Sequence, residues 1–150
     1  MKLVQAVISK ATDVDKIEKE FTKEISDFLD DVVDFVYERS QENIVANNSF
    51  GVTGNLYGKV TVDKKRPFEK HLIYEAPYAE EVEYGTLPHF VPPEVLEEWC
   101  RKKYGLTREA AERAAYFVSK KIAEVGIKEK PFLRPAMNEA QVRFLNKAKL

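Results

Sequence analysis

The sequence predicts an α+β fold in which a long N-terminal helix packs on a small antiparallel sheet, with an inserted helical hairpin and a C-terminal helix. Three observations lead to this prediction. Apolar residues recur every three or four positions over 12–46, which is the spacing of an amphipathic helix. The segments 59–63 and 68–75 alternate between apolar and polar residues, as half-buried strands do. After residue 93 the helical spacing returns three times.

Length and composition favour one globular domain. Of the 150 residues, 44% are hydrophobic and 33% are charged, which excludes wholesale disorder. We therefore expect a single domain over 1–150 with the helical insertion at 87–129. Cys100 is the only cysteine, so no disulfide can form within the chain. No stretch approaches the roughly 20 apolar residues that a membrane-spanning helix needs.

Charge is balanced overall but not along the chain. The 24 basic and 25 acidic side chains give a net charge of −1, which provides no overall positive field to attract nucleic acid. Residues 13–42, however, hold 11 acidic and 4 basic side chains, a net charge of −7. Residues 101–150 hold 13 basic and 5 acidic side chains, a net charge of +8. The chain is therefore dipolar.

The first element contains the strongest helical pattern. Residues 2–9 carry Val and Ile and are expected to form a short strand; their apolar run is too short for a secretion signal. The helix is then expected to begin at Thr12, which has capping-box spacing to Asp15, and to reach residue 46. Its apolar stripe comprises Val14, Ile17, Phe21, Ile25, Phe28, Val32 and Phe35. At 1.5 Å per residue this helix is roughly 50 Å long, which favours assembly, although a helix broken near Ser40 or Asn43 is an equal alternative.

The two alternating segments most simply form a hairpin. Lys65-Arg66-Pro67 supplies the turn between them. The residues expected on one face of the second strand are Phe68, Leu72 and Tyr74. A short helix is predicted over 78–84, ended by Gly85.

Three more helices complete the prediction. The first covers 94–104 and is closed by Gly105, and the second begins at Thr107 as N-cap and ends at Gly126. The residues of this pair expected to face inward are Val95, Leu96, Trp99, Cys100, Ala111, Ala115, Val118, Ile122 and Val125. A terminal helix is expected over 136–148.

Signatures of catalysis are poor. His71 shares a strand face with two glutamates and is expected to be solvated, and His89 is expected to pack or hydrogen-bond locally. No HxxxH or CxxC spacing supports a metal site, so we predict no catalytic, cofactor-binding or metal-binding residue. Glu80 and Glu83 are expected on one face of the short helix near its N-terminal half, where the helix dipole favours negative charge.

Basic and aromatic side chains point to contact surfaces. The clusters 64–66 and 101–103 could contact phosphates, but no stacking ladder or recognition helix accompanies them. Aromatic residues reach 11% and gather at turns and connectors, where they serve either protein contacts or the cover of a sheet edge. The residues concerned are Tyr57, Tyr74, Tyr78, Tyr84, Phe90 and Phe132.

Three short motifs follow one another between residues 53 and 136. They are Thr53-Gly54-Asn55-Leu56, then Tyr78-Ala79 with Val82-Glu83-Tyr84-Gly85-Thr86, then Pro131-Phe132-Leu133-Arg134-Pro135-Ala136. Their order resembles the minor tail-component or neck family of tailed phages, typified by the gene-ten product of a lambda-like phage. The family pattern runs "TG-x-L", "YA-x-x-V-E-[YF]-GT" and "PFL-x-PA". The insertion that contains Pro88, His89, Phe90 and Trp99 resembles the longer variety of this family.

The resemblance implies which residues act in assembly rather than in catalysis. These candidates are Thr53, Gly54, Leu56, Tyr78, Ala79, Glu83, Tyr84, Gly85, Thr86, Pro88, His89, Phe90, Pro131, Phe132, Leu133 and Pro135. It implies a structural subunit of a phage or provirus virion that forms a homo-oligomeric ring at the head–tail junction, after synthesis in the host cytoplasm. The implied partners are copies of the chain itself, head-completion or adaptor proteins, and tail-terminator or tail-tube proteins. DNA would pass through the channel without sequence-specific readout, and neither a cofactor nor a membrane is implied.

The residues themselves agree with a ring and leave two other classes open. A head-to-tail ring needs two complementary patches, which the acidic helix and the basic C-terminal third can supply. The segments 86–93 and 130–135, rich in Pro and aromatic residues, are candidates for arms that dock on a neighbour. A DNA-binding accessory protein would instead present a basic face, and a small hydrolase a deep pocket with convergent polar groups.

Overall fold

A computed structural model describes the backbone of residues 2–49 and 54–148. The elements in chain order are α1 (Lys2–Ala46), α2 (Asn55–Gly58), β1 (Val60–Arg66), β2 (Glu69–Tyr74), α3 (Ala79–Tyr84), α4 (Pro93–Tyr104), α5 (Arg108–Val125) and α6 (Leu133–Ala148). The predicted α+β class is confirmed, with its long first helix, antiparallel strand pair, helical hairpin and last helix. Within the described ranges, none of the helices combines the length and apolar character needed to cross a membrane.

Helix α1 is longer than the sequence predicts. The strand expected over 2–9 is wrong, and so is a helix start at Thr12, because the helix already includes Lys2. A strand is stable only when another strand pairs with it, and the described sheet contains β1 and β2 alone. The alternative break near Ser40 or Asn43 does not occur, since α1 continues to Ala46. With 45 residues it spans about 68 Å.

Ser40 and Asn43 remain within α1 because each forms a hydrogen bond to a distant part of the fold. The Ser40 hydroxyl lies 2.5 Å from the hydroxyl of Tyr74 and also donates to the Tyr37 carbonyl at 2.8 Å. The Asn43 side-chain amide donates to the Phe132 carbonyl at 2.9 Å. The Asn43 amide therefore bonds outside its own helix, and the Ser40 hydroxyl combines a contact with Tyr74 with a bond to a carbonyl of its own helix, so neither residue interrupts α1.

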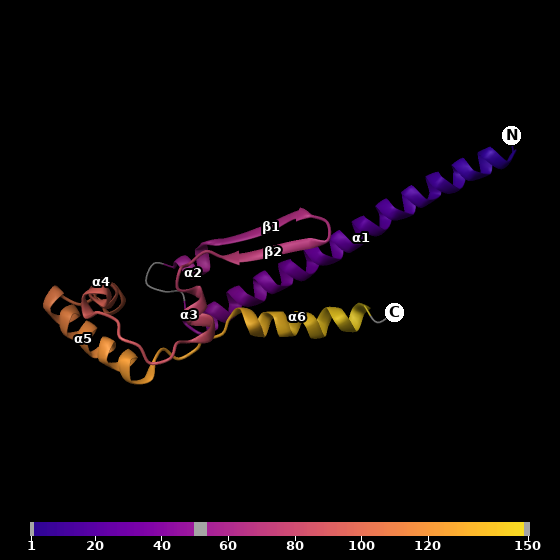
Figure 1. Cartoon of the computed structure of the whole chain (residues 1–150). Helices are drawn as coiled ribbons and strands as arrows, with labels where there is room; N and C mark the ends of the chain where they lie inside the picture. Colours follow the sequence, from indigo (N-terminus) through magenta and orange to yellow (C-terminus); the bar gives the residue numbers. More distant parts are fainter. Residues whose placement is uncertain (1, 50–53, 149–150) are drawn as a thin grey trace.

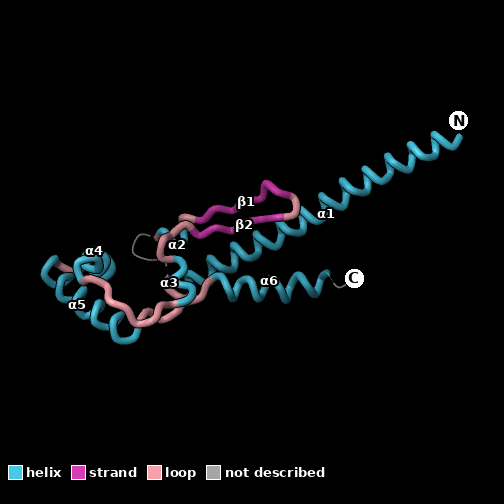
Figure 2. Tube along the Cα trace, viewed as in Figure 1, coloured by secondary structure: helices cyan, strands magenta, loops and turns pink. Residues whose placement is uncertain are grey.

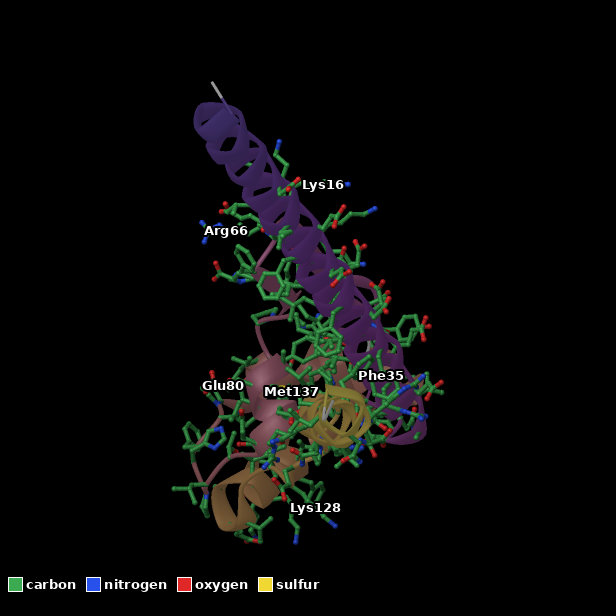
Figure 3. The ribbon with its side chains drawn as sticks, turned by 90° about the vertical axis from the view of Figure 1, so that its right-hand side faces the viewer. Lys16, Phe35, Arg66, Glu80, Lys128 and Met137 are labelled. Carbon is green, nitrogen blue, oxygen red and sulfur yellow. The ribbon has the colours of Figure 1, made fainter. Side chains whose placement is uncertain are left out.

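The β-hairpin and α6 cover different sides of the C-terminal half of α1, and the N-terminal half projects beyond them (Figure 1). Helix α6 runs antiparallel to α1 and beside it, as the trace in Figure 2 also shows. Their shared core contains Val36, Ala136, Ala140 and Phe144, packed against Val32, Phe35, Leu72 and Leu133. Figure 3 shows Phe35 at this α1–α6 contact and Lys16 far along the projecting part of α1.

The hairpin is antiparallel, with Val60 opposite Tyr74 and Asp63 opposite His71. Leu72 and Tyr74 face inward as predicted, but Phe68 lies beside the turn and is exposed. The inward place nearest the turn belongs to Lys70, whose side chain is only 5% exposed.

Lys70 fastens the hairpin to α1. Its Nζ atom lies 3.0 Å from a carboxylate oxygen of Asp30 and donates to the hydroxyl of Ser26 at 2.9 Å. It also donates to the Lys64 carbonyl at 3.0 Å. The ammonium thus has two hydrogen-bond acceptors and a carboxylate that balances its charge, which is what allows a lysine to be buried.

Helices α4 and α5 form a hairpin with a small core of its own. Cys100, Ala111 and Ala115 are buried there, and burial raises the pKa of the Cys100 thiol. The predicted caps are confirmed: the Thr107 hydroxyl accepts from the Ala110 N–H, and Gly105 is left-handed at φ 63°. Two expected inward residues are wrong, because Val95 and Val125 are exposed.

Two segments of the chain, which lie side by side, join the helical hairpin to the rest of the molecule. Thr86 and Ile127 pair in an isolated antiparallel bridge, with N–H···O distances of 2.9 and 3.2 Å. Beside them Gly85 and Gly126 have φ of 68° and 73°. A Cβ on Gly126 would lie 2.0 Å from the Thr86 carbonyl oxygen, and one on Gly85 2.5 Å from the Ile127 oxygen. Both glycines are therefore required by this close approach.

Gly126→Ala is expected to lower the free energy of unfolding by more than about 1 kcal/mol, because it adds both a clash with rigid backbone and a disfavoured φ. Amide hydrogen exchange at Thr86 and Ile127 should accelerate. Thermal unfolding and exchange measure the two effects. Gly58→Ala is the matched control, since a Cβ there meets no atom within 4 Å and should leave both unchanged.

Candidate functional site

The second and third sequence motifs meet at a buried carboxylate. Glu83, at the C-terminal end of α3, is 4% exposed. Its Oε2 atom accepts the backbone N–H groups of Phe132 and Leu133 at 2.8 and 2.9 Å, and its Oε1 atom accepts that of Arg134 at 2.9 Å. These N–H groups stand at the start of α6, where a helix leaves its first donors without internal partners. Glu83 is therefore the cap of a helix 50 residues further along the chain.

The prediction that Glu83 serves the dipole of its own helix is wrong. The carboxylate lies at the far end of α3 and faces the positive N-terminal end of α6. This cap also explains why α6 begins at Leu133, three residues before the expected start. Pro135 is tolerated because it lies in the first turn, where its missing N–H is not needed.

The protonation of Glu83 is controlled by these contacts. Burial by itself would raise the pKa of the carboxyl group, but the three N–H groups and the Arg134 side chain outweigh it and hold the pKa below its ordinary value. The carboxylate is thus charged near neutral pH. Both of its oxygens accept hydrogen bonds from the start of α6, so the arrangement is that of a helix cap.

Arg134 links the parts of this junction, although the sequence did not single it out. Its Nε atom donates to Glu83 at 3.0 Å, and its Nη2 atom donates at 2.7 Å to both the Glu83 carbonyl and the Glu129 carboxylate. The guanidinium also lies 4.7 Å from the ring centre of Tyr84, which is 60% exposed. Its place after Phe132-Leu133 in the third motif was the signal available in the sequence.

A second cluster ties the first motif to the third. Leu56, Ile44, Ala76 and Phe132 are buried together, and Phe132 packs edge-on against Tyr74 at a ring distance of 4.8 Å. Two further motif residues, Tyr78 and Ala79, pack on this cluster. Gly54, with φ of 69°, starts α2, while Thr53 lies outside the described residues. The three motifs therefore meet in one region, which is the main structural result for the candidate residues.

The candidate residues in the segment 86–93 do not belong to this region. Pro88, His89 and Phe90 are exposed, and the His89 ring lies 2.8 Å from the Leu87 carbonyl and 3.3 Å from the Thr86 hydroxyl, both within the segment 86–93. Apart from Tyr84, which is exposed beside Arg134, the structure thus separates the candidates into those packed at the Glu83 junction and those exposed in the segment 86–93. The junction holds the fold, and the segment 86–93 is available for contacts.

The other sequence candidates lie apart from this junction. His71 is exposed in β2 and pairs with Glu69 at 2.8 Å. In the two basic clusters, Lys64 and Arg66 are paired with Asp34 and Glu69, and Lys102 with Glu98. Among the described side chains no group of three or more His, Cys, Asp or Glu residues could hold a metal ion.

The exposed surface is unusually large. The chain exposes 11198 Å², whereas a compact monomer of 17.3 kDa exposes about 7,800 Å². Large apolar side chains contribute to it, and those exposed on the helices include Val14, Ile17, Phe21, Val95, Tyr116, Phe117, Met137, Val142 and Leu145. Where such side chains adjoin one another, as Val14, Ile17 and Phe21 do on α1, they are candidates for an interaction surface.

Comparison of the chain with protein-family models, with curated proteins and with solved structures found no match.

Proposed function

We propose that this protein is a structural subunit of a phage or provirus virion, a minor tail component or neck protein that joins head to tail by forming a ring. The observation that carries the proposal is the surface: about 3,400 Å² more is exposed than in a compact monomer of this mass. A subunit that buries two standard interfaces, each about 800 Å² per partner, accounts for about half of this excess. Further contacts with head-completion, tail-terminator or tail-tube proteins can cover more of it.

The assignment to a neck, rather than to any assembly, rests on the order of the three motifs. Their residues meet at one junction, so they act as a unit that sets the relative placement of α1, α3 and α6. A rigid junction of this kind suits a subunit that must present fixed surfaces to its neighbours. In the virion the ring would surround DNA without reading its sequence.

Self-association should weaken as salt is added, because charge pairs exposed at an interface are screened within about 10 Å at 0.1 M salt. Light scattering of concentrated protein over a series from about 0.05 M to about 0.5 M NaCl measures this. Negative-stain images at the lowest salt should show closed rings with a central channel.

A monomer at every concentration, or binding of random duplex DNA that falls steeply with salt, would contradict the proposal and favour the DNA-binding alternative. The genes beside this one offer an independent check: genes for portal, capsid and tail-tube proteins are expected there.

A further inference from the structure

The projecting half of α1 carries an apolar stripe that no described residue covers. Val14, Ile17 and Phe21 are each at least 60% exposed. They lie three and four residues apart, so they share one face of the helix. We call residues 13–25 of α1 the arm; it is distinct from the segments 86–93 and 130–135.

The stripe on the arm continues a stripe that is covered elsewhere. Phe28 and Phe35 each pack edge-on against Phe144 of α6, with ring centres 5.7 Å apart. Phe21 lies seven residues before Phe28, two helical turns along the same face. The face therefore extends past the end of α6 without its cover, and a further apolar element is expected to continue the contact.

Charges are sorted around the arm. The carboxylates of Asp13, Glu20 and Glu24 border the stripe on one side of the helix and that of Glu18 borders it on the other, while Asp15 lies further round, one turn from Lys19. Lys16, Lys19 and Lys23 all fall on the opposite face. Of the five carboxylates only Glu20 is in an ion pair with a described residue, and its distance to Lys16 is 3.9 Å. The surface around the stripe is thus acidic, and a partner with apolar and basic groups fits it.

The outer face of α5 has the complementary character. Tyr116 and Phe117 lie opposite the side that packs on α4, with Phe117 68% exposed. Arg113, Lys120 and Lys121 stand one turn away from Phe117, all are exposed, and none is in an ion pair with a described residue. We call these five residues the α5 patch; Glu109 and Glu124 lie beyond its two ends.

We propose that the arm of one subunit docks on the α5 patch of a second copy of this chain. The arm and the α5 patch lie at opposite ends of the elongated molecule (Figures 1 and 2), as a head-to-tail contact requires. Pairing of two arms is disfavoured, because it would place acidic borders against one another. The arm is about 18 Å long and α5 about 27 Å, so one can lie along the other.

This inference rests on the proposed function, since it names the contact by which the ring would form. It uses part of the charge difference along the sequence, since the arm lies in the acidic segment and the α5 patch lies in the basic one. Repetition of one such contact gives a ring where the rotation between subunits closes.

Charge exchange tests the pairing. The double variant Glu18→Lys with Glu24→Lys, and separately Lys120→Glu with Lys121→Glu, should each raise the dissociation constant of self-association at least about tenfold, because like charges then face each other. A chain with all four substitutions restores opposite charges and should assemble like the wild type. All four side chains are exposed, so circular dichroism should show an unchanged fold. Lys16→Glu with Lys23→Glu, on the back of the arm, is the control and should have no such effect.

A second measurement detects the contact without a closed ring. Ile17→Cys and Phe117→Cys in one chain should form disulfides between copies under mild oxidation, whereas Lys19→Cys with Phe117→Cys should not. Cys100 is fully buried and does not interfere. Dimers and ladders without rings would support the docking and contradict the ring. Rings that assemble normally in both charge variants, or no rescue in the fourfold variant, would overturn the docking while leaving the proposed function intact.

Discussion

Replacing Glu83 by alanine is expected to lower the free energy of unfolding by about 3 kcal/mol, the largest effect of any single polar substitution in this chain. The variant leaves the first N–H groups of α6 without an acceptor and removes the charged partner of Arg134. Urea unfolding monitored by circular dichroism measures the loss. Glu80→Ala is the matched control on the same short helix: Glu80 is exposed, is labelled in Figure 3, and should change stability by less than about 0.5 kcal/mol.

The contribution of Glu83 to the free energy of unfolding should decrease as the pH falls. Because the pKa of its carboxyl group is lowered in the folded state, the unfolded chain takes up the proton first as the pH falls. The stabilisation is therefore complete above the ordinary pKa of 4.5 and is lost as the pH falls through the lower pKa of the folded state. The difference in stability between wild type and Glu83→Gln should shrink over this range. A difference that stays constant down to about pH 2 would show that the charge of Glu83 does not cap α6.

Phe132→Ala is expected to lower the free energy of unfolding by about 3–5 kcal/mol, because it opens a cavity where three motifs meet. The side chain is 2% exposed and lies among Ile44, Leu56 and Tyr74. The same unfolding experiment measures it. A loss below about 1 kcal/mol would mean that this cluster does not hold α6 to the end of α1.

Tyr84→Ala provides the contrast within the same motifs. Its ring is exposed and contacts Arg134 by a cation–π interaction that is worth about 0.5–1 kcal/mol at such a site. We expect its unfolding to resemble that of the wild type. Both residues lie in the motifs that carry the family resemblance, yet Phe132 is part of the core and Tyr84 is part of the surface.

Local patterns were sufficient for most of the helices. The apolar spacing in α1, the Thr107 cap of α5 and the left-handed Gly105 each depend on residues within one or two turns. Such features can be read from sequence because their cause and their effect lie close together in the chain. The class of the fold follows from them.

Other features depended on partners far away in sequence. Residues 2–9 favour a strand locally but have no strand to pair with, so they extend α1. Phe68 alternates correctly with Leu72, yet the turn beside it moves it to the surface. Val95 and Val125 match the helical period, but the small core of α4 and α5 ends before it reaches them.

The sequence by itself determined the order of the helices, the periodicity of their apolar residues and the opposite charges of the acidic and basic segments. Only the tertiary structure decided what the apolar faces meet. Glu83 became a cap because α6 comes to it from 50 residues away, and the stripe of α1 divides into a covered and an open part because α6 ends before the stripe does. The physical reason is that helix periodicity is a local property of the backbone, whereas burial depends on which segments the folded chain brings together.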